Sequence, residues 1–244
     1  MRIPSATYRL QLGPGFGFPE VAAVLEYLEA LGITDLYLSP VFRARPGSAH
    51  GYDVLDPTRL NPELGSPEEF RALTEAVRRR GLGWLQDIVP NHMAYDGRNP
   101  YLADILESGE QSAYRDLFDV DWNPPFESLR GRVLAPLLGS YCGEALERGE
   151  IRIVYSEEGF RVTYFDQAFP LGIDSYPDLL APGTSELRRA LGEDDPDFVR
   201  YLGVLYVLRT LASTPNLEER GAQVRFIALS AGRRWAAARF FGGA

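Results

Sequence analysis

The chain has 244 residues, which is enough for one large domain or two small ones, and 45% of them are hydrophobic, an ordinary share for a globular protein. With 34 acidic and 25 basic residues its formal net charge is −9, which argues against a nucleic acid or an anionic membrane as partner and suits a neutral substrate such as a carbohydrate. The single cysteine, Cys142, excludes an internal disulfide and a metal site built from cysteines. Because the N-terminus lacks an apolar signal segment and no apolar run is long enough for a bilayer, we expect a cytoplasmic protein.

The first 92 residues alternate between strand and helix patterns. Short apolar runs at residues 6–12, 33–38 and 84–89 predict strands, and residues 41–65 have the character of a long loop. Apolar residues at three- and four-residue steps predict a helix over 21–31. A second helix is predicted from the sequence Ser-Pro-Glu-Glu at 66–69, which is a capping box with proline at the first helical position.

This alternation predicts βαβ units and a parallel sheet. The long inserts follow the second and third strands, at their carboxyl ends, where (β/α)₈ enzymes build their sites. The expected fold class is therefore α/β: a partial TIM (β/α)₈ barrel, made of its first three β/α units, with an inserted α+β subdomain after the third strand. We expect the β/α units to occupy residues 1–92 and the subdomain residues 93–195.

The rest of the chain departs from the alternation. Within the expected subdomain, residues 151–155 and 160–165 predict a β-hairpin. A helix is expected to begin at Asp195-Pro196-Asp197, and residues 196–227 have a helical character, including 216–227. Residues 228–244 contain no acidic residue in an otherwise acidic chain, so we expect this tail to be out of frame or the end of a truncated gene product.

Both histidines of the chain stand in two polar segments that follow predicted strands. One is His-Gly-Tyr-Asp at residues 50–53, and the other is Asp-Ile-Val-Pro-Asn-His at residues 87–92. Taken singly, the first could be a plain turn with an exposed aromatic, and Asp87 could cap a neighbouring helix. Because both lie in order after consecutive strands, we favour a functional site, in which Tyr52 offers a platform for a sugar ring and Asp87 and His92 bind its hydroxyls.

The segment 87–92 resembles the first characteristic segment of the α-amylase superfamily of glycoside hydrolases. Within that superfamily, several further segments are similar to the maltooligosyl trehalose synthases, and together they cover most of residues 3–227. These segments are residues 7–12, 36–41, 47–53, 118–122, 129–139 and 164–171.

The resemblance implies an intramolecular transglucosylation that turns the reducing-end α-1,4 linkage of a maltooligosaccharide or α-glucan into an α,α-1,1 linkage, in trehalose formation. It implies that Tyr52 stacks on the sugar at the reactive subsite, that Asp87 organises the site and that His92 binds the primary hydroxyl. With His50 and Asn91 these form the expected substrate-binding set. A retaining mechanism needs no cofactor and no catalytic metal, although Asn91 and the acidic loops leave a structural calcium ion open.

The sequence also departs from the family. There the nucleophilic aspartate lies in Gly-x-Arg-x-Asp on the fourth strand, the acid glutamate on the fifth, and a His-Asp pair after the seventh, but this chain has no histidine after His92. Asp174 lacks the preceding arginine and is rejected as the nucleophile. We assign no catalytic residue and expect an inactive fragment that self-associates through an open sheet edge. The alternatives are another superfamily hydrolase or 4-α-glucanotransferase, or a non-catalytic glucan-binding remnant.

Overall fold

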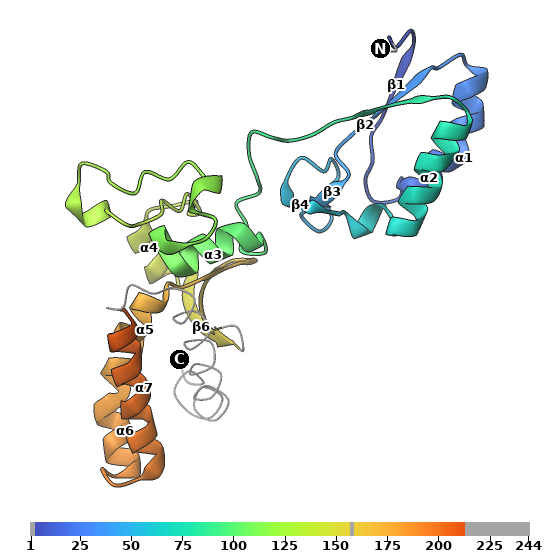
Figure 1. Ribbon diagram of the computed structural model, residues 1–244. Coiled ribbons are helices and arrows are strands. Elements are labelled where there is room, and N and C mark those ends of the chain that lie inside the picture. Colours follow the sequence, from blue (N-terminus) through green and yellow to red (C-terminus); the bar gives the residue numbers. More distant parts are fainter. Residues whose placement is uncertain (1–2, 157–158, 213–244) are drawn as a thin grey trace. The chain divides into compact units, whose positions relative to one another are not determined.

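The computed structural model describes residues 3–156 and 159–212, and its chain divides into two compact units, Met1–Asn99 and Pro100–Ala244 (Figure 1). Among the described residues no helix combines the length and the apolar character that crossing a membrane requires. The domain limits expected at residues 92, 195 and 227 stay predictions.

The first unit is built on a parallel sheet. Strand β1 (Thr7–Leu10) pairs with β2 (Asp35–Leu38), and β2 pairs with β5 (Gly83–Gln86), all in parallel. The predicted arrangement of three neighbouring parallel strands is therefore confirmed. The third strand ends three residues earlier than predicted, so Asp87 follows the strand directly.

Two helices cover one face of this sheet (Figure 1). They are α1 (Phe18–Ala30) and α2 (Pro67–Arg79), and the predicted capping box of α2 is present, since Ser66 Oγ accepts from the Glu69 N–H at 3.2 Å. Alternate strand residues point into the core with them, because side chains of a strand alternate between its faces. This core contains Leu10, Leu36, Leu38, Val21, Leu25, Leu28, Leu73 and Val77.

The opposite face of the sheet carries the residues in the other register. Arg9, Tyr37 and Leu85 stand opposite one another across the three strands. Arg9 is exposed, and Leu85 keeps 41% of its accessible surface. Arg9 and Tyr37 on this face lie close to the carboxyl ends of their strands.

The segment after β2 is not the plain loop predicted for residues 41–65. It forms an antiparallel pair, β3 (Phe42–Ala44) with β4 (Val54–Leu60), followed by the 3₁₀ helix η1 (Pro62–Leu64). The register shifts twice within this pair, so the regular alternation that marks a strand in the sequence is interrupted.

The second unit combines short helices with an antiparallel sheet. Strands β6 (Ile151–Ser156), β7 (Gly159–Tyr164) and β8 (Gln167–Pro170) pair in order, which confirms the predicted hairpin and adds a third strand. Phe160, Ile173, Tyr176 and Leu208 form its core. The other elements are α3 (Pro100–Ser108), η2 (Gly109–Gln111), η3 (Arg115–Leu117), η4 (Glu127–Leu129), α4 (Cys142–Glu147), η5 (Ile173–Ser175), α5 (Tyr176–Leu180), η6 (Ala181–Gly183), α6 (Thr184–Leu191) and α7 (Pro196–Ala212).

Helix α7 begins where the sequence predicts. Asp195 Oδ1 accepts from the Asp197 N–H at 2.8 Å, so this carboxylate caps the first turn. The helix predicted over 216–227 and the atypical tail 228–244 lie outside the described residues.

Candidate functional site

Asp87 is the centre of a cluster of polar side chains at the carboxyl end of the parallel sheet. Its N–H donates to the Leu38 carbonyl at 2.9 Å, which continues the β2–β5 pairing by one residue. Its Oδ2 accepts from the hydroxyls of Tyr37 at 3.0 Å and Tyr52 at 2.5 Å. Asp87 and Tyr52 are 35 residues apart in the chain, and the fold brings them together as the sequence predicted.

Arg9 closes this cluster from strand β1. Its Nη2 donates to the Tyr52 hydroxyl at 3.1 Å, and its guanidinium lies 5.6 Å from the centre of the Tyr37 ring, a cation–π contact. The hydrogen bond to Asp87 and, secondarily, burial raise the pKa of Tyr52 above its usual value. The phenol therefore stays protonated at neutral pH and remains a donor to the carboxylate. Sequence reasoning did not single out Arg9 and Tyr37, although strand alternation places both on the face opposite Leu10 and Leu38.

His50 stands beside Tyr52 in the preceding turn. Its Nδ1 accepts from the Tyr52 N–H at 3.0 Å and lies 3.8 Å from Asp53 Oδ1. Its carbonyl accepts from Gln11 Nε2 at 3.2 Å, which ties the turn to the end of β1. The backbone of this turn, rather than the histidine ring alone, thus sets the direction of the Tyr52 ring.

Gly51 permits this turn in two ways. Its φ is +75°, in the left-handed region, and a Cβ at this position would lie 2.9 Å from the Pro40 carbonyl oxygen. Gly47 has the same φ of +75° but open space around the position of a Cβ.

We therefore expect Gly51→Ala to lower the free energy of local opening of this turn by about 2–3 kcal/mol, against about 1 kcal/mol for Gly47→Ala, because only the first adds a steric clash to the backbone strain. Hydrogen exchange of the amides in 45–56 measures both values. Equal losses in the two variants would mean that the contact with Pro40 does not matter.

Asn91 and His92 are placed differently from the other three predicted residues. Both are exposed, and Asn91 Nδ2 lies 3.5 Å from His92 Nδ1. Within the part of the chain that the structure describes, no hydrogen bond or ion pair joins either side chain to Tyr52 or Asp87. The structure thus unites His50, Tyr52 and Asp87, and it leaves Asn91 and His92 open to solvent on the loop beyond. The same described residues contain no group of three or more His, Cys, Asp or Glu side chains that could hold a metal ion.

An ionic cluster around the buried carboxylate of Asp96 fixes the far end of that loop. Asp96, with 2% of its side chain exposed, accepts from Arg45 Nε at 2.9 Å and from Arg98 Nε and Nη2 at 2.8 and 2.6 Å. Burial alone would raise the pKa of Asp96, but the two arginines outweigh it and lower the pKa to about 2. The Ala94 N–H also donates to the Val54 carbonyl at 2.8 Å, so the loop after β5 is fastened to the β3–β4 pair. Sequence reasoning missed this cluster, because Arg45 and Asp96 are 51 residues apart and no local pattern links them.

Comparison with known proteins finds similarity over part of the chain. Residues 19–136 match the family model described as alpha amylase, catalytic domain. A putative maltooligosyl trehalose synthase of Mycobacterium tuberculosis is 44% identical over 142 residues, which are 55% of this chain and 18% of that protein.

Two solved structures resemble the chain as well. A crystal structure of a maltooligosyl trehalose synthase has a TM-score of 0.63 and 42% identity over 69% of this chain and 22% of its own. The maltooligosyltrehalose synthase from Arthrobacter ramosus has a TM-score of 0.60 and 37% identity over 69% of this chain and 21% of its own. The chain thus spans about a fifth of the length of the relatives it matches. These matches fit a TIM-barrel-type α/β fold, and the N-terminal part of the chain is similar to the catalytic domain of the α-amylases and to maltooligosyl trehalose synthases.

Proposed function

We propose that this chain is the N-terminal portion of a maltooligosyl trehalose synthase, which converts the reducing-end α-1,4 linkage of a maltooligosaccharide to α,α-1,1 without releasing the sugar. The observation that carries the proposal is the cluster of Arg9, Tyr37, Tyr52 and Asp87 at the carboxyl end of three parallel strands. In barrel enzymes this end of the sheet holds the reacting part of the substrate. In the same proposal, the parallel sheet is the first three β/α units of the barrel, and residues 93–195, most of which lie in the second unit, are the inserted subdomain.

The cluster suits a sugar platform. Asp87 and Arg9 hold the Tyr52 hydroxyl from two sides, so the ring is fixed before substrate arrives and little side-chain entropy is lost on binding. Asp87 accepts two phenolic hydrogen bonds on one oxygen, which suits a carboxylate that organises the site rather than one that attacks a sugar. Exposed His92 and Asn91 remain available to bind hydroxyls of the substrate.

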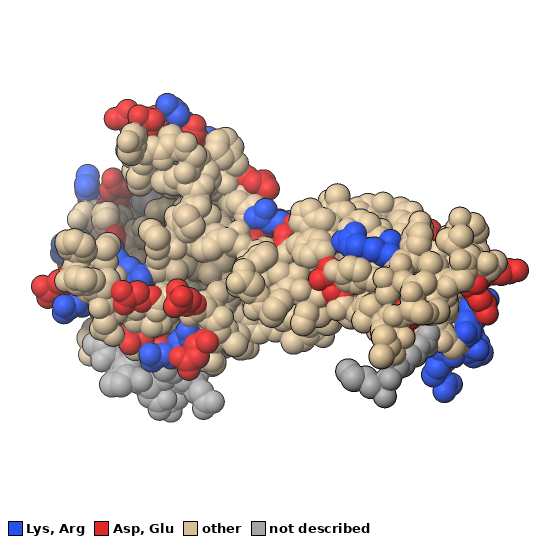
Figure 2. Space-filling view, turned by 90° about the horizontal axis from the view of Figure 1, so that it is seen from above, with Lys and Arg blue, Asp and Glu red and all other residues tan. Residues whose placement is uncertain are grey.

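A neutral substrate also agrees with the distribution of charge. On the face shown in Figure 2, acidic and basic side chains are interspersed, with wide uncharged areas between them. Such a surface neither attracts nor repels a carbohydrate through its field.

The test of the function is product analysis on the complete gene product. The DNA downstream of the codon for Ile227 is sequenced first, and we expect an in-frame or one-base-shifted continuation that encodes Gly-x-Arg-x-Asp. That complete enzyme is then incubated with maltopentaose. A synthase yields a non-reducing glycoside with no rise in reducing ends, whereas a superfamily hydrolase raises the number of reducing ends. A rise in the number of reducing ends would contradict the proposal and would indicate a hydrolase of the superfamily.

The 244-residue chain itself is expected to be inactive. A retaining glycosidase needs a nucleophile and an acid about 5–5.5 Å apart, and the engagement of Asp87 with two tyrosines gives it neither role. Purified chain should leave maltopentaose unchanged, and it should elute as an oligomer on gel filtration because the edges of a parallel sheet can pair with another copy. A monomer that forms trehalosyl product would show that the catalytic carboxylates lie within these residues.

A further inference from the structure

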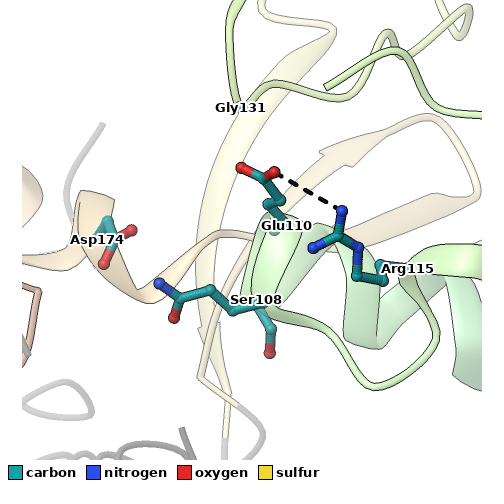
Figure 3. A pocket seen from close by; sticks show the side chains of 7 residues that line it. Ser108, Glu110, Arg115, Gly131 and Asp174 are labelled. Carbon is teal, nitrogen blue, oxygen red and sulfur yellow. Dashed lines mark ion pairs between the residues drawn. The ribbon is translucent and has the colours of Figure 1, made fainter. Parts of the chain in front are cut away.

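A pocket of about 530 Å³ in the second unit has an arginine in its wall, but the charge of this arginine is already paired. Figure 3 shows the guanidinium of Arg115 facing the carboxylate of Glu110, and Arg115 Nη2 lies 3.8 Å from Glu110 Oε1. Arg115 Nε also lies 3.6 Å from Asp116 Oδ1. The arginine therefore offers no unpaired charge to a ligand.

Gln11 is the first residue after strand β1, and three hydrogen bonds orient its side-chain amide. Its Oε1 accepts from Arg9 Nη2 at 2.9 Å, and its Nε2 donates to the carbonyls of Leu12 at 3.1 Å and of His50 at 3.2 Å. Both N–H groups of the amide are therefore used. A reversed amide would place its oxygen against two carbonyls and its N–H groups against the arginine, so the network fixes the orientation.

The backbone that carries this amide is anchored in the sheet. The Leu12 N–H donates to Ser39 Oγ at 2.8 Å in a buried hydrogen bond, and Leu12 lies in the core with Leu10. Because side chains alternate along a strand, Gln11 points to the same side as Arg9. Gln11 is exposed, but it extends from a backbone that is bonded to the end of β2.

Gln11 and Arg9 complete a cycle of hydrogen bonds around Tyr52. The Nη2 of Arg9 carries two N–H groups, and besides Gln11 it contacts the Tyr52 hydroxyl at 3.1 Å. The cycle returns through the carbonyl of His50, two residues before Tyr52. One amide thereby holds the tyrosine at its phenol, through Arg9, and at its backbone, through the turn. Without Gln11, Arg9 would keep its contact with the Tyr37 ring, but an exposed arginine could adopt other rotamers.

We propose that Gln11 is a positioning residue, which acts through Arg9 and the turn at His50 to hold the Tyr52 ring in the direction in which it stacks on a sugar. The stacking role of Tyr52 rests on the proposed function, whereas the cycle of hydrogen bonds rests on the contacts alone. Because Gln11 and Arg9 are exposed, their bonds stabilise the fold little. Their effect should therefore appear in catalysis, where a small displacement of a positioned group is costly.

The experiment follows the consumption of maltopentaose by the complete gene product, whichever product is formed. Gln11→Met keeps the length of the side chain and removes all three hydrogen bonds. It should lower kcat/KM about 10- to 100-fold while Tyr52 is present. In a Tyr52→Ala background it should lower kcat/KM by less than about twofold, because residues that act as one unit are not additive. A merely structural role would cost the same in both backgrounds.

Two checks separate positioning from loss of structure. The Tm of Gln11→Met should lie within about 4 °C of the wild-type value. The matched control is Thr7→Val, because Thr7 is exposed and stands on the same side of β1 as Arg9, and this variant should keep wild-type kcat/KM. If Gln11→Met does not fold, Gln11→Glu replaces it with the same expected coupling to Tyr52, since a carboxylate cannot donate to the His50 carbonyl. Equal losses in both backgrounds, or wild-type kcat/KM in Gln11→Met, would overturn the proposal.

Hydrogen–deuterium exchange of the 244-residue chain provides the test if the gene product does not consume maltopentaose. The peptide that contains residues 49–53 should exchange about 2- to 10-fold faster in Gln11→Met, the range for losing a hydrogen bond, and at the wild-type rate in Thr7→Val. Unchanged exchange in Gln11→Met would remove the positioning role.

Failure of this inference is distinct from failure of the proposed function. A gene product that raises the number of reducing ends contradicts the synthase assignment, and the coupling between Gln11 and Tyr52 can still be measured on its turnover. Additive losses in an enzyme that makes trehalosyl product remove the role of Gln11 alone.

Discussion

Replacing Asp96 by asparagine is expected to lower the free energy of local opening of the loop after β5 by about 2–3 kcal/mol, the range for losing buried hydrogen bonds to charged groups. Asparagine keeps the shape of the side chain but presents one acceptor atom where four N–H groups now bond at 2.6–2.9 Å, three from arginine side chains and one from the Arg98 backbone. Hydrogen exchange of the Ala94 amide, which donates to Val54, measures the loss.

The matched control is Glu68→Gln, which removes an exposed ion pair with Arg71 at 3.1 Å and should cost under about 0.5 kcal/mol. The pH dependence of this free energy gives a second check. Folding lowers the pKa of Asp96 from 3.8 to about 2, so the ionised carboxylate stabilises the folded loop at any pH above the pKa of the unfolded chain. The stabilisation by Asp96 should therefore be complete above about pH 4 and should be lost as the pH falls towards 2. A difference between wild type and Asp96→Asn that is unchanged at pH 2 would exclude the ionic explanation.

In a complete enzyme that contains this segment, Tyr52→Ala and His92→Ala should each lower kcat/KM roughly 30- to 1000-fold. This corresponds to a loss of about 2–4 kcal/mol of transition-state stabilisation. Tyr52→Ala removes both the ring that would stack on the sugar and the hydroxyl that is hydrogen-bonded to Asp87 and Arg9. Steady-state kinetics with maltopentaose provide the measurement.

Two further variants separate these contributions. Tyr52→Phe keeps the ring and loses only the hydroxyl, so it should lose less than Tyr52→Ala. Tyr27→Ala, on the exposed side of α1 with 64% of the residue accessible, should keep wild-type kinetics. Near-wild-type kcat/KM in Tyr52→Ala and His92→Ala would remove both residues from the reactive subsite.

The sequence was informative wherever one local pattern determines structure. Apolar runs between glycine and proline signals located β1, β2 and β5, and the capping box located α2. The β3–β4 pair escaped this reasoning, because β4 contains Asp56 and Pro57 and its register shifts break the alternation. A proline inside a run argues against a strand, and here the strand tolerates it beside an irregular pairing.

Some residues of the candidate site could be predicted from the sequence, and others could not. Tyr52 and Asp87 could be predicted to meet, because both follow consecutive strands whose carboxyl ends lie at one edge of the sheet. Arg9 comes from the first strand, where a strand pattern alone does not distinguish a site residue from a surface residue. The cluster of Arg45, Asp96 and Arg98 depends on the β3–β4 pair, so it could not be inferred before that pair was known.

The spacing of these contacts along the chain determines when they can form. The bonds from Arg9 to Tyr52, from Tyr52 to Asp87 and from Arg45 to Asp96 link residues 43, 35 and 51 positions apart. Closing such loops costs entropy before any bond compensates for it, whereas α1 and α2 need only local contacts. We expect α1 and α2 to form first and the contacts between distant residues, including the ion pairs of Asp96, to form later, so that substitutions at Asp96 accelerate unfolding while the folding rate changes little.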